Sequence, residues 1–176
     1  ISSKSPRRPA MLPFTPTVSC GPLPEKDTVA YHCITHEKFS WLSQAVEEYP
    51  EFDVYVWADY GIFHLPGMTT QVVEELAEKL DNRRLYFPGW WQQGPITADV
   101  CNWRFCGSMF AVPKEFVHQL DAEVRDVARK HIMATRNVEW EVNTWARWEL
   151  LTSLPIHWSR GQHMAPDGLQ GPTRIV

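Results

Sequence analysis

A compact β-prone run lies between two stretches of helical periodicity, and this alternation constrains the fold more than any other feature of the sequence. The run spans Val54 to Ala58, and its nearly continuous apolar composition predicts a buried central strand. Apolar residues recur near a period of 3.6 on both sides, which predicts one helix over 28–48 and another over 69–81. The alternation of Val29, Tyr31 and Cys33 leaves a short strand at 28–34 as the alternative to the start of the first helix. Asp27 or Thr28 is placed to cap the first of these helices.

The rest of the chain continues the alternation of strands and helices, which favours a single α/β layered domain over 27–176. Residues 1–26 contain six prolines and predict an extended, irregular arm. The remaining elements are expected as strands at 85–87 and 105–112, helices at 113–131 (beginning with Pro113) and 140–152, and a loop from Pro155 onward.

Composition narrows the class of protein. The chain has 176 residues, of which 44% are apolar, enough to bury one core. A net charge of −4 gives no electrostatic case for binding nucleic acid, and no run of about 18 apolar residues predicts a membrane span. The four cysteines form no C-x-x-C pair, which favours reduced thiols in a cytoplasmic protein.

Asp59 follows the predicted strand directly and precedes Gly61. Ligands of open α/β sheets bind beyond the carboxyl ends of strands. Mg²⁺ and Mn²⁺ prefer oxygen ligands and commonly bridge a protein carboxylate to substrate phosphates. The alternative is an aspartate that starts a turn before glycine, and spacing alone favours that alternative.

The segment from Val54 to Ile62 resembles a motif of a small group of GT-A glycosyltransferases, found in large algal viruses and in bacterial proteins linked to surface polysaccharides. In that group a hydrophobic strand ends in Trp-x-Asp-x-Gly-Ile, which is matched here by Trp57, Asp59 and Gly61. Other stretches agree in order over roughly residues 26–163. They are the helix from Lys26 to Lys38, the strand Cys106–Phe110 and the helix start Trp140–Trp145.

This resemblance implies a GT-A-like (Rossmann-like) single domain with a central mixed sheet. It also implies a nucleotide-sugar donor, a carbohydrate or other hydroxyl acceptor, and Mn²⁺ or Mg²⁺ held with the donor diphosphate by Asp59. The chain departs from the pattern in two ways. Position 61 is glycine in place of a second carboxylate, and no strand is evident in 1–25, so the first strand is missing or the arm replaces it.

Two further residues are candidates for chemistry. Glu141 lies between two apolar residues at a helix start and matches the family pattern. It is a candidate general base for transfer with inversion, although a glutamate there also complements the helix dipole. His163 resembles the Gly-x-His element that completes the metal site in many GT-A enzymes, against the alternative of a solvated loop histidine.

Aromatic and small residues complete the expected site. The adjacent rings of Trp90 and Trp91 suit stacking on a sugar, or a plug under the loop, and Gly107 leaves room for the donor sugar near the backbone. Substrate-binding residues are expected at Trp57, Tyr60, Gly61, Trp90, Trp91, Cys106, Gly107 and Asn143.

Two rival functions remain open. A non-catalytic carbohydrate-binding module would use the same tryptophans but would need neither Asp59 nor Glu141. A glycoside hydrolase would use these two carboxylates across one glycosidic bond.

Overall fold

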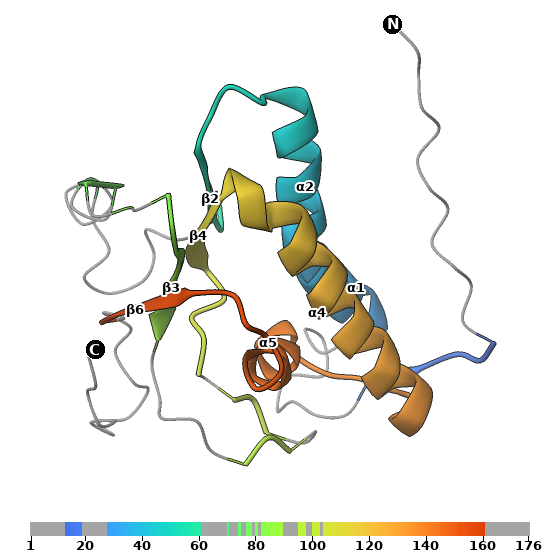
Figure 1. Cartoon of the computed structure of the whole chain (residues 1–176). Coiled ribbons are helices and arrows are strands. Elements are labelled where there is room, and N and C mark those ends of the chain that lie inside the picture. The colour runs from blue at the N-terminus through green and yellow to red at the C-terminus, as the bar shows by residue number, and fades with distance from the viewer. Residues whose placement is uncertain are drawn as a thin grey trace, which may run out of the picture.

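The computed structural model describes residues 13–18, 28–60, 82–89, 95–97, 100–102 and 104–160, with single positions at 70, 74, 77, 78 and 80. These residues form a mixed α/β fold, which confirms the predicted class (Figure 1). The elements are β1 (Thr17–Val18), α1 (Val29–His36), α2 (Lys38–Glu48), β2 (Val54–Ala58), β3 (Leu85–Gly89), β4 (Met109–Pro113), α4 (Lys114–Thr135), β5 (Asn137–Val138), α5 (Glu141–Glu149) and β6 (Ile156–Arg160).

The larger sheet has the strand order β2-β4-β3-β6. Strand β4 is antiparallel to both β2 and β3, whereas β3 is parallel to β6, so the sheet is mixed as expected. It follows that β2, β3 and β6 all run in the same direction. Their carboxyl ends therefore lie at the same end of the sheet, which is where ligands of α/β domains bind.

The predicted strand 54–58 has the expected bounds, but its predicted central, buried position is wrong. Strand β2 is at the edge of the sheet, and Val56 is 45% exposed. The central, fully buried position belongs to β4, in which all five residues are buried. An apolar, β-branched run suits both positions, because residue type reports strand preference and the order of strands is a tertiary property.

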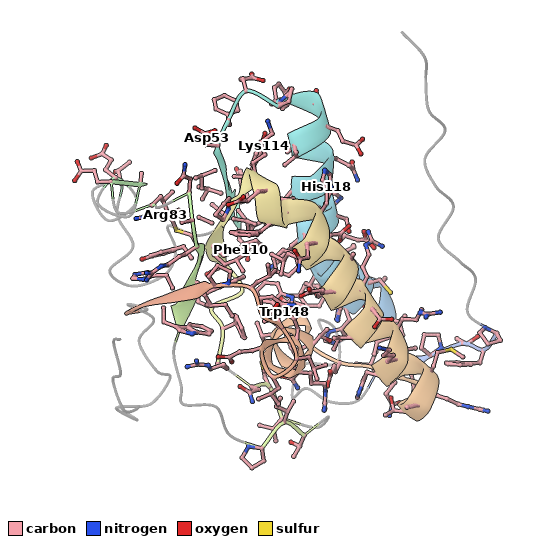
Figure 2. The ribbon with its side chains drawn as sticks, viewed as in Figure 1. Asp53, Arg83, Phe110, Lys114, His118 and Trp148 are labelled. Atoms are coloured by element: carbon pink, nitrogen blue, oxygen red, sulfur yellow. The ribbon has the colours of Figure 1, made fainter. Side chains whose placement is uncertain are left out.

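The hydrophobic core lies between this sheet and the helices, with Phe110 of β4 near its centre (Figure 2). The ring of Phe110 lies 4.9 Å from that of Phe39 on α2 and 5.3 Å from that of Trp145 on α5. Helices α2 and α4 lie side by side, and α5 packs beside α4 (Figure 1). The aromatic contacts thus fix the start of α2 and the middle of α5 against the same strand.

The single helix predicted over 28–48 is instead two helices, with a break at Glu37. Thr28 caps the first as expected, since its Oγ1 accepts a hydrogen bond from the Tyr31 amide at 3.1 Å. The Glu37 amide bonds to the carbonyl of Ile34, three residues back, which tightens the last turn of α1. Because a new helix begins at Lys38, the side chain of that residue points into the protein. Ile34, which belongs to the predicted apolar stripe, is instead 58% exposed.

Several predicted boundaries also need correction. The strand expected over 105–112 begins only at Met109, because Gly107 and Ser108 form a turn. Pro113, expected to start a helix, is the last residue of β4, and α4 then runs to Thr135, beyond the predicted end at 131. The helix expected over 140–152 is the shorter α5.

Strands appear at four places where none was predicted. The tail from Pro155, expected to be loop, contains β6. Strand β3 continues through Pro88 and Gly89, which were expected to close it. Within the predicted arm, β1 pairs in parallel with the equally unpredicted β5.

Only part of the predicted 69–81 helix is described, and its residues 70, 74, 77 and 78 are helical. None of the helices in the described ranges is long and apolar enough to cross a membrane.

Candidate functional site

Asp59 is the first residue after β2, and the surrounding structure fixes its carboxylate. Its backbone amide donates to the Ser108 carbonyl at 2.8 Å, which continues the β2–β4 pairing by one step. The indole Nε1 of Trp57 donates to Asp59 Oδ1 at 2.6 Å. The Asp59 side chain is 40% exposed, so part of this oriented carboxylate is open to a ligand.

Lys38, the first residue of α2, joins the two carboxylates that the sequence singled out. Its Nζ lies 3.3 Å from Asp59 Oδ1 and 3.2 Å from Glu141 Oε1. The same ammonium donates to the Gly107 carbonyl at 2.7 Å. Asp59, Gly107 and Glu141 are far apart in sequence, and Lys38 brings them into one cluster, which we call the Lys38 cluster.

Glu141 lies in the first turn of α5, and its side chain is only 7% exposed. The helix N-terminus stabilises its negative charge, in addition to the contact with Lys38. Its second oxygen, Oε2, is buried and has no hydrogen-bond partner among the described residues. Buried polar atoms are usually paired, so within the described part of the chain this oxygen is an acceptor without a donor.

Gly107 leaves room for the cluster itself. A Cβ at this position would lie 2.9 Å from Glu141 Oε1 and 3.2 Å from Cγ1 of Val142. The space next to Gly107, which the sequence assigned to a donor sugar, is therefore occupied by the side chains of Glu141 and Val142. Neighbouring Cys106 is buried, and its Sγ lies 3.0 Å from the Ser108 hydroxyl, so it supports the turn that carries Gly107.

Aromatic rings adjoin Asp59. Trp57 is stacked between Trp41 of α2, at 5.4 Å and 19°, and Phe110, at 6.3 Å and 14°. Trp41 is 40% exposed, and Tyr60, next to Asp59 in sequence, is fully exposed. The exposed indole of Trp41 therefore stacks on the ring that bonds the Asp59 carboxylate. This combination suits a sugar, because an exposed ring stacks on C–H groups while a carboxylate accepts hydrogen bonds from hydroxyls.

Asn143 is completely buried, and its side chain holds a neighbouring segment in place. Its Nδ2 donates to the carbonyls of Thr97 and Val100, at 3.1 and 2.9 Å. Its Oδ1 accepts from the Asn102 amide at 2.6 Å. These bonds use the polar atoms that a substrate would need, so the geometry gives Asn143 a role in positioning 97–102.

Glu139, two residues before Glu141, belongs to a separate buried network. Its Oε1 accepts from Arg147 Nε at 3.0 Å and from the Thr144 hydroxyl at 3.3 Å. Its Oε2 lies 3.6 Å from Nε2 of His131. Burial lowers the pKa of His131, although the nearby Glu139 carboxylate acts in the opposite direction.

The metal site expected from the sequence is only partly covered by the described residues. Within that part of the chain, no group of three or more His, Cys, Asp or Glu side chains is placed to hold a metal ion. Gly61, Trp90, Trp91 and His163 lie outside the described residues. Asp59 is the only residue of the Lys38 cluster with a substantially exposed carboxylate.

Lys38 and Trp41 were not selected as site residues from the sequence. A signal for Lys38 was present, because it falls at helical spacing from Leu42 and Ala45, on the apolar side of the predicted helix. A lysine on an apolar face needs a buried partner, and the two carboxylates provide one.

Comparisons with models of protein families, with curated proteins and with solved structures found no match for this chain.

Proposed function

We propose that this protein is a glycosyltransferase that moves a sugar from a nucleotide-sugar donor to a hydroxyl acceptor. The observation that carries the proposal is the Lys38 cluster, which joins Asp59 and Glu141 at the end of the sheet where β2, β3 and β6 terminate. The sequence selected these two carboxylates separately, 82 positions apart, from the resemblance to GT-A enzymes.

The strand directions add support. Trp90 directly follows β3, and His163 comes three residues after the end of β6. Strands β2, β3 and β6 all end on the side of the sheet that carries Asp59. The segments that contain Trp90 and His163 therefore begin, in sequence, at the ends of strands on that side. This is the arrangement in which α/β domains assemble a ligand site from several strand ends.

In this proposal Asp59 faces the donor. Its exposed carboxylate, oriented by Trp57 Nε1 and Lys38 Nζ, is the group available to the donor sugar or to a cation bound with the diphosphate. For transfer with inversion, Glu141 takes the proton of the acceptor hydroxyl on Oε2, its unpartnered oxygen among the described residues. The role of Lys38 and Gly107 is to hold these two carboxylates at a fixed separation.

The Mn²⁺ or Mg²⁺ expected from the sequence does not fit between the two carboxylates, because Lys38 Nζ is there. A divalent cation would supply positive charge against the leaving diphosphate. In the described part of the chain only the exposed portion of Asp59 is placed to contact such a cation, so the proposed catalytic roles belong to the protein's own side chains.

The same geometry bears on the glycoside hydrolase alternative. A hydrolase needs open space between its two carboxylates for a glycosidic bond and, with inversion, for a water. Here an ammonium that contacts both carboxylates fills that space. The cluster therefore suits a hydrolase less well than a transferase in which the two carboxylates act on different partners.

A matched pair of variants tests the proposal. Asp59→Asn keeps size and one acceptor oxygen but removes the charge. Asp53→Asn makes the same change at an exposed aspartate just before β2, beside Lys114 (Figure 2). Melting temperatures should be measured with a panel of nucleoside diphosphates and nucleotide sugars, with and without Mn²⁺.

We expect a ligand to raise the Tm of the parent and of Asp53→Asn, but not of Asp59→Asn. Ligand at about 100 times its dissociation constant adds about 2.7 kcal/mol of stability, which is several degrees for a chain of this size. An equal response of all three proteins would remove Asp59 from the site. A parent that responds to no nucleotide would overturn the proposed function.

A further inference from the structure

The Lys38 ammonium occupies the position that a divalent cation would need in order to bridge Asp59 and Glu141. Its Nζ lies 3.3 Å from one carboxylate oxygen and 3.2 Å from the other. Oxygen ligands bind Mg²⁺ or Ca²⁺ at about 2.0–2.6 Å, so an ion held by both oxygens would lie against the Lys38 nitrogen, and the two positive charges would repel each other. The space between the carboxylates can therefore contain the ammonium or a metal ion, but not both.

Lys38 is also held firmly in this position. Its side chain is 7% exposed, and its Nζ donates to the Gly107 carbonyl at 2.7 Å. The nitrogen lies 5.9 Å from the ring centres of both Trp57 and Trp145, so indoles flank it as well. A lysine that left this position would leave the buried Glu141 carboxylate without a counter-charge and next to a second carboxylate, which is costly.

We infer that Lys38 is the built-in cation of the carboxylate pair, so that a divalent ion reaches Glu141 only when the Lys38 side chain is removed. This inference deepens the proposed function, because it identifies the residue that supplies positive charge between Asp59 and Glu141. It rests on the proposed function only in taking these two carboxylates as the site. It makes Lys38 a positioning residue, and it confines any metal ion in the parent to the exposed part of Asp59.

The test uses Mn²⁺ alone, without nucleotide, and four proteins: the parent, Glu141→Gln, Lys38→Ala, and the double variant Lys38→Ala/Glu141→Gln. Alanine removes both the charge and the stem of Lys38, which leaves two carboxylates and an open space between them. We expect Mn²⁺ to raise the Tm of Lys38→Ala more than that of the parent, and Glu141→Gln to abolish this gain in the double variant. A purely structural lysine would not create Mn²⁺ binding that depends on Glu141.

Two results would overturn the inference. One is a Lys38→Ala protein whose response to Mn²⁺ equals that of the parent. The other is a parent whose Mn²⁺ affinity falls on Glu141→Gln, since Glu141 would then already contact metal with Lys38 present. This second comparison, made by calorimetric titration, still decides the question if Lys38→Ala fails to fold. The Mn²⁺ experiment contains no nucleotide. Its outcome is therefore independent of the nucleotide experiment on Asp59→Asn, which tests the proposed function.

Discussion

At the scale of single residues, Gly107 shows how closely the Lys38 cluster is packed. In Gly107→Ala the new Cβ would lie 2.9 Å from Glu141 Oε1 and 3.2 Å from Val142 Cγ1. Glu141 cannot move away freely, because Lys38 and the α5 backbone hold it. We expect the substitution to cost about 1–3 kcal/mol of unfolding free energy, measured by urea denaturation.

A double-mutant cycle identifies the contact responsible. In a Glu141→Ala background the carboxylate is absent, so Gly107→Ala should cost clearly less than in the parent. An unchanged cost would mean that the clash is with Val142 and that Gly107 does not serve the carboxylate cluster.

At the scale of elements, Glu123 couples α4 to the end of α5. Its Oε2 accepts from Trp148 Nε1 at 2.7 Å and from the Thr152 hydroxyl at 2.8 Å, and its Oε1 accepts from Gln119. Burial acts to raise the pKa of Glu123, but these hydrogen bonds outweigh it and hold the pKa below the ordinary value of 4.5. The carboxylate form therefore fixes the helix whose other end carries Glu141.

This shift predicts a dependence of stability on pH. A carboxyl whose pKa is lower in the folded state than in the unfolded state contributes stability above the unfolded pKa, and that stability is lost as pH falls through the folded pKa. Glu123→Gln should reduce the unfolding free energy at pH 7 by about 1–3 kcal/mol and should flatten its decline below pH 4.5. Urea denaturation at several pH values measures both effects.

The control is Glu115→Gln, at an exposed glutamate in the first turn of the same helix. It should change stability by no more than about 0.5 kcal/mol at pH 7. Equal effects of the two substitutions would show that the bonds to Trp148 and Thr152 contribute nothing.

At the scale of the whole molecule, the Glu139 network connects α4, β5 and α5. Glu139 is 1% exposed and pairs with Arg147, whose side chain is 29% exposed. Glu139→Ala would leave Arg147 and the Thr144 hydroxyl without this partner. Because Arg147 reaches solvent, we expect a loss near the lower end of the about 3–5 kcal/mol typical of broken buried pairs, measured by urea denaturation.

A variant that removes the charges of both Glu139 and Arg147 distinguishes the contribution of their ion pair from the contributions of their other contacts. The variant Glu139→Ala/Arg147→Ala should lose less stability than the sum of the two single changes. Strict additivity would argue that the two side chains contribute only through separate contacts.

Features that depend on neighbouring residues could be predicted from the sequence. Residue type and period located β2 and its end at Asp59, limited the first helix cap to Asp27 or Thr28, and indicated that α4 and α5 exist. Each of these follows from backbone preference or from apolar spacing within one segment. The resemblance in turn selected Asp59 and Glu141 separately, and nothing in the local sequence places them together.

Features that depend on distant segments arise from tertiary contacts and could not be predicted from the sequence. The tertiary structure put β4 in place of β2 at the centre of the sheet, made β6 a strand by pairing it with β3, and broke the first helix so that Lys38 turned inward. Strand order and the partner of a buried charge arise from contacts across the chain, to which local periodicity is insensitive. The contact of Lys38 with both Asp59 and Glu141 is of this kind, since it required α2, β2 and α5 to pack around one strand.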